Sequence, residues 1–352
     1  MKVAFYNHTS EISGAEISLL LTAGHLREAD PVLLAPEGEL LDRARAAGIS
    51  VMPVESHRAR LSRNPIRLIR DLVGMVRSGY RLSALIRKQG IELIHANSLR
   101  AGIMASLFRW HHRRPVIWHV RDALPVGIVG RAICGLAGRS ADAIIGISQS
   151  VQKDFRGHGL DRKLHLVHNG VKVPDMAPGE KEEHRKRIRQ QLQTPEGARV
   201  AAIIGQIAPW KRQEDALRAA RMLIDRGYPF YLWVVGEAKF RQENAEYEVM
   251  LKGMAEDLGI ADRVRFTGFR NDVMEICCAA DLLFLCSDNE PFGRVVIESM
   301  SMGTPAVATN AGGVPEIIED GVTGLLYETG QVGQLADRAA RLLEDEGARI
   351  RM

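Results

Sequence analysis

The chain has 352 residues, of which 46% are hydrophobic and 26% are charged, enough for two ordinary domains with filled cores. Its four cysteines, two of them adjacent (Cys277 and Cys278), lack the spacing of a metal site, so we expect small core residues in a reducing compartment. The chain begins on a strand pattern, and no apolar stretch reaches the roughly 18 residues that span a bilayer. We therefore expect a cytoplasmic protein.

Charge is divided unevenly along the chain. Residues 1–175 hold 25 Lys and Arg against 15 Asp and Glu, a net charge of +10, whereas the remainder holds 22 against 28, a net charge of −6. The first part therefore has an electrostatic reason to approach anionic surfaces.

Residues 1–175 alternate apolar runs with helical patterns, which is typical of a doubly wound α/β domain. The predicted strands lie at 3–7, 32–35, 51–54, 93–96, 116–120, 143–147 and 164–167. We assign these residues to the first of two domains.

The segment 58–88 predicts a basic amphipathic helix, with Asp71 as its only acidic residue. Its basic residues are Arg58, Arg60, Arg63, Arg67, Arg70, Arg77, Arg81, Arg87 and Lys88. Its apolar residues at helical spacing are Ile66, Ile69, Val73 and Val76. Two compatible interpretations follow: the apolar stripe packs on the sheet, and the basic residues of Arg63–Lys88 face solvent or an anionic membrane. An interleaved set of aromatic residues is lacking, so we expect no nucleic-acid binding.

The strand at 115–122 carries two candidate polar residues. Side chains alternate along a strand, so His119 and Arg121 share one face. A structural role for His119 in the core is the alternative. His111 and His112 are flanked by arginines, which disfavours a metal site, and we expect none elsewhere.

Residues 176–198 change in character, with Pro178-Gly179 followed by a charged run, and we interpret them as a linker region with a short solvated helix. Residues 199–352 resume the α/β alternation and form the second domain. Its predicted strands lie at 201–204, 231–235, 264–267, 282–286, 305–308 and 325–327. The chain has neither the Gly-x-Gly-x-x-Gly of nicotinamide dehydrogenases after its first strand nor a P-loop, which argues against both classes.

A phosphate clamp is predicted after the first strand of the second domain. The strand ends at Gly205, where backbone amides can approach an anion, and Lys211 leads into a helix from about Gln213. The N-terminus of that helix adds partial positive charge. A diphosphate leaving group would be stabilised there as its charge develops.

Two glutamates, Glu290 and Glu298, follow a buried strand. Glu290 falls in the loop after it, and Glu298 falls in the second turn of a helix that starts near Gly293 and ends at Gly303. Carboxylate oxygens accept hydrogen bonds from neighbouring hydroxyls, such as those of sugars and riboses. The alternative is a helix cap and a salt bridge.

Five segments, in one order over nearly the whole chain, resemble motifs of the family 4 retaining glycosyltransferases. They correspond to a glycine-rich loop, the segment ahead of the linker, the diphosphate motif, the nucleoside-contacting strand and the donor-sugar signature. In that order they are 13–16 (SGAE), 168–171 (HNGV), 205–211 (GQIAPWK), 264–269 (VRFTGF) and 288–313.

This resemblance implies the GT-B fold, an α/β architecture of two Rossmann-like, doubly wound parallel-sheet domains facing each other across a cleft. The first domain would bind the acceptor, a sugar or lipid-linked sugar, and the second the nucleotide sugar donor. It also implies a hexosyltransferase type of enzyme that retains anomeric configuration and needs no metal ion or other cofactor. Bacterial members commonly build surface polysaccharide, lipopolysaccharide or glycolipid, so we expect a cytoplasmic protein or one peripheral on the inner face of the cell membrane.

The same resemblance assigns the site. Glu290 would hold the sugar hydroxyls at the catalytic centre with His119 or Arg121, while Glu298 would hold the ribose diol. Since it places the two glutamates at opposite ends of the donor, they are not the carboxyl pair of a glycosidase. The expected donor-binding residues are Gly14, Gly205, Gln206, Lys211, Arg212, Phe269, Phe292, Gly293, Arg294, Glu298 and Gly313.

The chain departs from the family pattern in three places. In the family an arginine is common at the position of Gln206, and a glycine usually follows the lysine, where this chain has Arg212. One positive charge is therefore missing from its usual place. Our hypothesis is that Arg212 or Arg294 replaces it. The family histidine aligns better with Arg121 than with His119, and we assign the pair. The final crossover helix of the fold is expected to be missing, because the chain ends in what resembles the penultimate one.

Two alternatives stay open. A nucleotide-sugar epimerase of the same fold would use acidic residues to remove a sugar proton. A non-catalytic nucleotide-sugar-binding subunit would bind donor without transfer, in keeping with the departures at Gln206 and Arg121.

Overall fold

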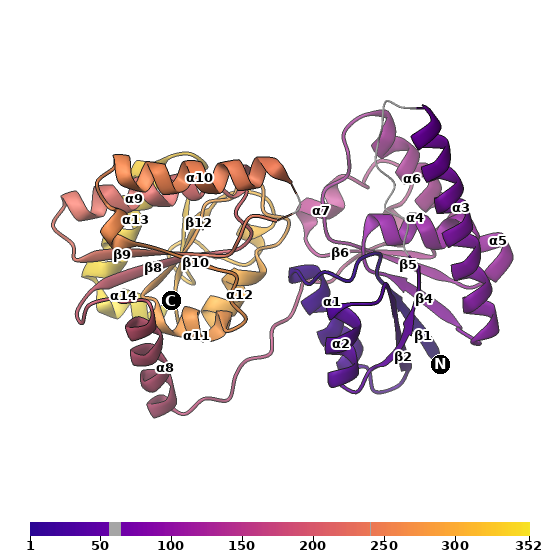
Figure 1. Ribbon diagram of the computed structural model, residues 1–352, viewed down its shortest axis with the longest axis horizontal. Helices are drawn as coiled ribbons and strands as arrows, with labels where there is room; N and C mark the ends of the chain where they lie inside the picture. The colour runs from indigo at the N-terminus through magenta and orange to yellow at the C-terminus, as the bar shows by residue number, and fades with distance from the viewer. Residues whose placement is uncertain (56–64, 240) are drawn as a thin grey trace. The chain divides into compact units, whose positions relative to one another are not determined.

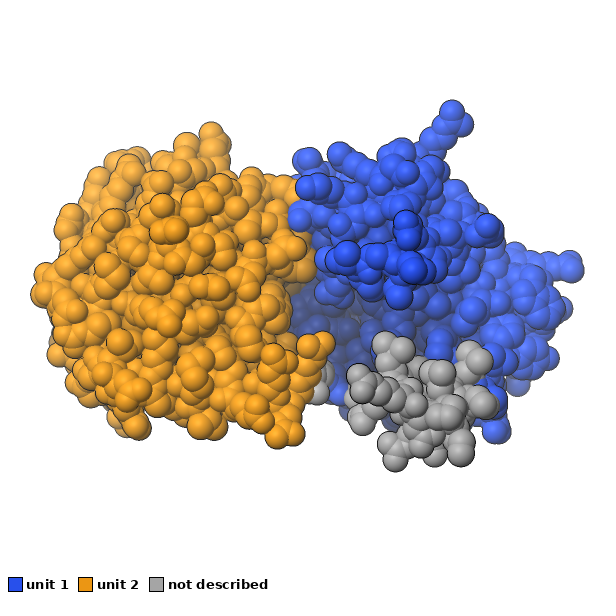
Figure 2. Space-filling model, turned by 90° about the horizontal axis from the view of Figure 1, so that it is seen from above, with its two compact units in different colours: residues 1–170 blue, residues 171–352 orange. Residues whose placement is uncertain are grey.

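The computed structural model describes residues 1–55, 65–239 and 241–352, and only the backbone of residues 65–72 and 178. The described chain divides into two compact units, Met1–Gly170 and Val171–Met352 (Figure 2). None of the described helices is both long enough and apolar enough to cross a membrane.

The first unit is built on a seven-stranded parallel sheet with the order β3-β2-β1-β4-β5-β6-β7. Its strands are β1 (Lys2–Tyr6), β2 (Asp30–Ala35), β3 (Ser50–Pro53), β4 (Leu93–Ala96), β5 (Val116–Val120), β6 (Ala143–Gly146) and β7 (Leu164–Leu166). Its helices are α1 (Gly14–His25), α2 (Glu39–Ala46), α3 (Pro65–Lys88), α4 (Leu99–Leu107), α5 (Arg109–His112), α6 (Ile128–Ser140) and α7 (Gln149–Lys153). The predicted doubly wound domain and its seven strands are confirmed (Figure 1).

Buried side chains explain why the strands of this sheet are nearly continuous apolar runs. Helices cover both faces of a parallel sheet, so both sets of alternating side chains lie in a core. Trp118 of β5 is fully buried, and its indole N–H donates to Ser106 Oγ at 3.0 Å. A side chain on Gly102 of α4 would collide with that ring, at 2.5 Å, so α4 packs directly on the sheet.

Helix α3 differs from the prediction in the face that it buries. Val73 and Val76 are exposed, whereas Leu82 and Ile86 are buried. Gly79 faces the Phe108 ring so closely that a Cβ would lie 2.7 Å from it, which fixes the inward face. The apolar spacing predicted the helix, but the close contact of Gly79 with Phe108 decided which face is buried. Arg58, Arg60 and Arg63 lie outside the described residues, as do the side chains of Ile66, Arg67, Ile69, Arg70 and Asp71.

The second unit contains a six-stranded parallel sheet with the order β10-β9-β8-β11-β12-β13. Its strands are β8 (Arg199–Ile204), β9 (Phe230–Val235), β10 (Val264–Gly268), β11 (Leu282–Leu285), β12 (Ala306–Thr309) and β13 (Leu325–Tyr327). Its helices are α8 (Pro178–Gln191), α9 (Gln213–Asp225), α10 (Gln242–Asp257), α11 (Val273–Ala279), α12 (Arg294–Ser301), α13 (Val332–Glu344) and α14 (Glu346–Arg351). Short 3₁₀ turns include η2 (Pro209–Lys211) and η4 (Val314–Glu316).

One apolar cluster lies on each face of this sheet. Phe284 and Leu217 belong to the cluster under α9, α10 and α13, and Leu283 and Trp233 belong to the cluster under α8, α11 and α12. Cys134, Cys277 and Cys286 are buried, and all four thiols of the chain are free. The cysteines therefore act as small core residues, apart from the half-buried Cys278.

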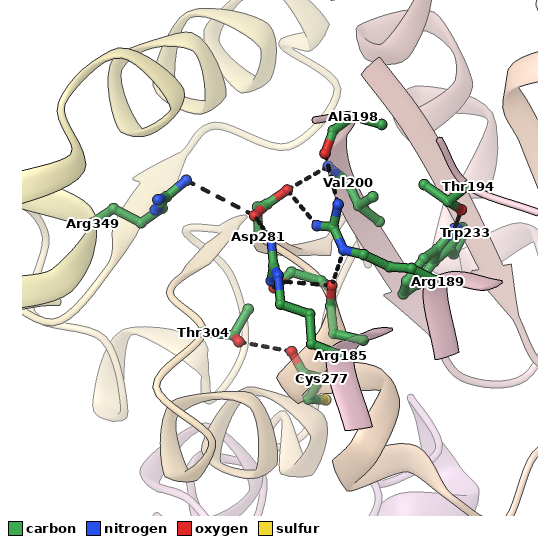
Figure 3. Close-up of polar contacts among 12 residues, drawn as sticks. Arg185, Arg189, Thr194, Ala198, Val200, Trp233, Cys277, Asp281, Thr304 and Arg349 are labelled. Carbon is green, nitrogen blue, oxygen red and sulfur yellow. Dashed lines mark hydrogen bonds and ion pairs between the residues drawn. The ribbon is translucent and has the colours of Figure 1, made fainter. Parts of the chain in front are cut away.

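Helix α8, within the predicted linker region, is fastened to the second unit by a buried aspartate (Figure 3). Asp281 contacts Arg185 at 2.6 Å and Arg189 at 2.9 Å, and accepts the Val200 N–H at 2.7 Å. Arg349 of α14 lies farther away, at 3.9 Å. Burial alone would raise the pKa of Asp281, but Arg189, Arg185 and the amide outweigh it and lower the pKa overall. One face of α8 is thus buried, in contrast to the solvated helix that its charged sequence predicted.

Candidate functional site

Glycines stand at the carboxyl ends of three neighbouring strands of the second unit: Gly205 follows β8, Gly236 follows β9, and Gly268 is the last residue of β10. The Gly205 N–H donates to the Val235 carbonyl and the Gly236 N–H to the Gly268 carbonyl, each at 2.9 Å. A Cβ on Gly236, whose φ is 139°, would lie 1.9 Å from the Gly205 carbonyl oxygen. The carboxyl edge of β8, β9 and β10 is therefore bare backbone, which a ligand can approach closely.

Lys211, at the end of η2, meets Glu290 across this edge. Lys211 Nζ lies 2.5 Å from Glu290 Oε2, and Ser287 Oγ donates to the same oxygen at 2.9 Å. Only 13% of the lysine side chain and 12% of the glutamate side chain are exposed. Strand order explains the meeting, because β8 and β11 are neighbours and their following loops leave from the same edge.

The glycine pair after β12 supports the Glu290 loop from behind. The Gly313 N–H donates to the Glu290 carbonyl at 2.8 Å, and a Cβ on Gly312, whose φ is 64°, would lie 2.1 Å from that oxygen. The turn fixes the Glu290 backbone because no side chain separates the two segments.

Glu298 lies in the second turn of α12, as the sequence predicted, and Gly303 (φ 81°) follows the helix. Glu298 Oε1 lies 2.8 Å from Arg294 Nε, and the side chains of Glu298 and Arg294 are each 13% exposed. Burial raises the pKa of Glu298, and the attraction of Arg294 offsets this only in part. Phe292, before the N-cap Gly293, is buried.

Arg212 and Arg294, the two candidates to replace the missing positive charge, both pair with carboxylates. Arg212 takes a left-handed conformation (φ 52°) and contacts Asp215 at 2.7 Å and Asp288 at 3.3 Å, and the hydrogen bond to Asp215 raises the pKa of the guanidinium. Arg294 pairs with Glu298. A donor diphosphate would have to share or displace these partners.

Gln206 and Phe269 flank the glycine edge. The Gln206 side-chain amide donates to the Lys239 carbonyl at 3.0 Å, and its backbone carbonyl accepts from Gln213 at 2.9 Å. Phe269 is 45% exposed, and Lys239 Nζ lies 4.4 Å from the centroid of its ring. Sequence reasoning missed Lys239 and Ser287, although Ser287 directly follows a buried strand, which is the available signal.

In the first unit, the ends of β4 and β5 place two histidines in contact. His119 Nδ1 lies 2.9 Å from His95 Nε2, and His119 Nε2 has no hydrogen-bond partner among the described residues. Burial, with the nearby charge of Arg121, lowers the pKa of His95 to about 3 and also lowers the pKa of His119. Both rings are therefore neutral near pH 7.

Arg121 is buried and holds strand ends together. Its Nε donates to Asn97 Oδ1 and its Nη1 to Asn169 Oδ1, each at 2.8 Å. Asn97 in turn donates to Asn7 at 3.0 Å, and Asn7 donates to Glu16 at 3.0 Å. The predicted His119 and Arg121 share one face, with 3.5 Å between Arg121 Nη2 and His119 Nδ1. The network was not predicted, because its amides come from three different strand ends.

The glycine-rich loop near the N-terminus connects to that network. Ser13 caps α1 and donates to Glu16 Oε2 at 2.5 Å, while the Ser13 N–H donates to the same oxygen at 3.0 Å. Gly14 is exposed at the first position of α1. The loop is therefore held by a carboxylate that also contacts Asn7.

Two family models match the chain: the Glycosyltransferase Family 4 model over residues 12–173 and the Glycosyl transferases group 1 model over residues 184–352. D-inositol 3-phosphate glycosyltransferase of Corynebacterium glutamicum (strain R) is 31% identical over 217 residues, 60% of this chain and 51% of that protein. The enzyme of the same name from Mycobacterium tuberculosis (strain ATCC 25177 / H37Ra) is 35% identical over 189 residues, 53% of this chain and 37% of that protein. The chain thus spans about half or less of the length of these curated relatives.

Solved structures extend the likeness to the whole chain. Anabaena Alr3699/HepE in complex with UDP and glucose matches with a TM-score of 0.86 and 26% identity, over 100% of this chain and 92% of that one. Sucrose-phosphate synthase from Thermosynechococcus elongatus matches in fold, with a TM-score of 0.75 and 19% identity over 99% of this chain and 91% of that one. The fold is GT-B, and the chain belongs to the family 4 glycosyltransferases.

Proposed function

We propose that this protein transfers a glycosyl group from a nucleoside diphosphate sugar to an acceptor hydroxyl. The observation that carries the proposal is the Lys211–Glu290 pair beside the bare glycine edge of the second unit. A cation, a glycine edge without side chains and a helix N-terminus suit a diphosphate, and a carboxylate beside them suits the adjacent sugar hydroxyls. HepE has been crystallised with UDP-glucose, which makes that donor the first to test.

In this proposal each residue has a role in the donor site. Lys211 stabilises the charge that develops on the leaving diphosphate, and Glu290 orients the sugar through its hydroxyls. Glu298 holds the ribose diol, and the backbone near Phe269 holds the base. The bond between the anomeric carbon and the phosphate oxygen breaks, the bond to the acceptor oxygen forms on the same face, and the acceptor proton passes to the leaving phosphate. No metal ion or cofactor is required.

Donor binding should raise the thermal stability of the protein. At a hundredfold excess over the dissociation constant, a bound donor adds about 2.7 kcal/mol to the free energy of unfolding. A thermal-shift panel of UDP-glucose with GDP, ADP and TDP sugars measures this and identifies the base, with free glucose as the control. If no nucleotide sugar raises the melting temperature, the proposed function is wrong.

The product of transfer should keep the anomeric configuration of the donor. Front-side attack leaves the acceptor on the face from which the phosphate departs, and NMR of the isolated glycoside reads the configuration directly. An inverted anomer would contradict the mechanism. Release of a free epimer without acceptor would instead identify an epimerase, and donor binding without transfer a non-catalytic subunit.

We further propose that the protein works on the cytoplasmic face of a bacterial membrane, in the synthesis of surface polysaccharide, lipopolysaccharide or glycolipid. The exposed face of α3 supports this, since Val73 and Val76 are accessible beside Arg77 and Arg81. Basic residues near an anionic bilayer contribute about 1 kcal/mol each to attachment. A lipid-linked sugar acceptor would be reached from that surface.

A further inference from the structure

The loop that joins β5 to α6 and the first turn of α6 expose three apolar side chains that the proposed reaction does not use. Val126 is 99% exposed, Ile128 is 76% exposed and Val129 is 58% exposed. The loop leaves the carboxyl end of β5, the strand that carries His119 and leads into Arg121. It therefore belongs to the edge of the first unit where the acceptor is proposed to bind.

This loop has a defined shape, and its apolar residues are held outward. The Leu124 N–H donates to Asp154 Oδ2 at 2.9 Å, which fixes the base of the loop. Gly130 lies under Pro125 so closely that a Cβ would sit 2.1 Å from the Pro125 carbonyl oxygen. Gly127, with φ of 86°, turns the chain into α6. Contiguous exposed apolar side chains of this kind mark a surface that binds something apolar.

Cations and carboxylates both lie near the loop, and the net charge of the first part of the chain favours an anionic partner. Arg131 in the first turn of α6 is exposed, and so is Lys153, next to the Asp154 that holds the loop. The first part of the chain, residues 1–175, carries a net charge of +10. Apolar tips flanked by cations suit the boundary between headgroups and acyl chains.

The order of the helices places the exposed residues of α3 on the same side of the first unit as the start of α6. Helices α3, α4 and α6 pack in that order on one side of the seven-stranded sheet (Figure 1). The exposed valines of α3 and the start of α6 are therefore on the same side of the first unit. A surface that contacts both would combine the apolar loop with the exposed arginines of α3.

We propose that the β5–α6 loop, with Val126, and the first turn of α6, with Ile128 and Val129, insert into the surface of an anionic lipid bilayer. Insertion brings the carboxyl edge of the first unit, with His119 and Arg121, to the membrane, where the headgroup of a lipid-linked acceptor lies. This deepens the membrane attachment proposed above and rests on it for its biological meaning.

The test is co-sedimentation of the full chain with vesicles of equal parts phosphatidylcholine and phosphatidylglycerol, and with phosphatidylcholine alone. The parent should bind the anionic vesicles, and V126S/I128S/V129S should bind them at least about tenfold more weakly, because burial of three aliphatic side chains is lost. The matched control is V249S/V322S/I350S, which removes two valines and one isoleucine that are exposed elsewhere. That control should bind like the parent.

The outcomes separate this proposal from the proposed function. Parent-like vesicle binding by V126S/I128S/V129S, equal losses in both triple variants, or no vesicle binding by the parent would each overturn the insertion. The UDP-glucose thermal shift of the same variants shows whether they remain folded and reports on the donor site independently. An absent shift in every protein would overturn the function and leave the vesicle result standing.

Discussion

Replacing Lys211 by alanine should lower kcat by about 100-fold to 1000-fold, the loss seen when one donor to a developing anion is removed. The cause is the missing charge at the leaving diphosphate, since Lys211 Nζ lies at the bare glycine edge and contacts Glu290 at 2.5 Å. Steady-state kinetics with the identified donor measure the effect. The matched control is Lys252→Ala, which removes an exposed lysine paired with Glu248. Such an exposed pair contributes at most about 0.5 kcal/mol to the stability of its helix. The kcat of Lys252→Ala should therefore stay within about twofold of the parent value.

Glu290→Gln and the double variant show whether the pair acts as a unit. Residues in direct contact give non-additive effects, so K211A/E290Q should lose much less than the product of the two single losses. A Lys211→Ala enzyme that keeps a third or more of the parent kcat would refute the assigned role. Fully additive losses would show that the 2.5 Å contact does not persist when donor is bound.

Removing the buried charge of Asp281 should destabilise the second unit by about 3–5 kcal/mol, as expected when one partner of a buried ion pair is deleted. Asp281→Ala leaves Arg185 and Arg189 without their shared carboxylate and the Val200 N–H without an acceptor. Hydrogen exchange of peptides from the second unit measures the loss, because unfolding of a two-unit protein is not a single transition. Asp262→Ala is the control, since that carboxylate is mostly exposed, and should change stability by less than about 0.5 kcal/mol.

The same aspartate predicts a dependence on pH. Its pKa is lowered in the folded state, so its contribution is complete above the unfolded pKa of about 3.9 and disappears as the pH falls through the folded pKa. Between pH 5 and pH 2 the parent should therefore lose more stability than Asp281→Asn does. Equal acid sensitivity of the two proteins would contradict the assignment.

Strand positions and the order of motifs were accessible from sequence because they depend on local patterns. Buried parallel strands are apolar runs, and Gly205 and Gly303 mark where elements end, so both sheets and α12 could be predicted. The proximity of Lys211 to Glu290, 79 residues apart, requires the order of β8 and β11 in the sheet. The spacing of residues along the chain does not reveal that order. From sequence, the two residues were assigned to one donor site through the motif resemblance.

Two failures have one physical cause, which is that a partner distant in sequence decides burial. The charged run of α8 predicted a solvated helix, but Asp281 makes burial of Arg185 and Arg189 tolerable. On α3 the close approach of Gly79 to Phe108 turned Val73 and Val76 outward. Periodicity identifies a helix and its apolar stripe, whereas the neighbouring helix selects the face.

The attachment of α8 determines how the second unit can be isolated as a fragment. A fragment that starts at β8 keeps Asp281 and loses both arginines that neutralise it, with only Arg349 left at 3.9 Å. It would also lose Ile188 from the apolar cluster under α11. A fragment for crystallography or NMR should therefore begin ahead of Pro178, so that it keeps α8 and the two arginines that neutralise Asp281.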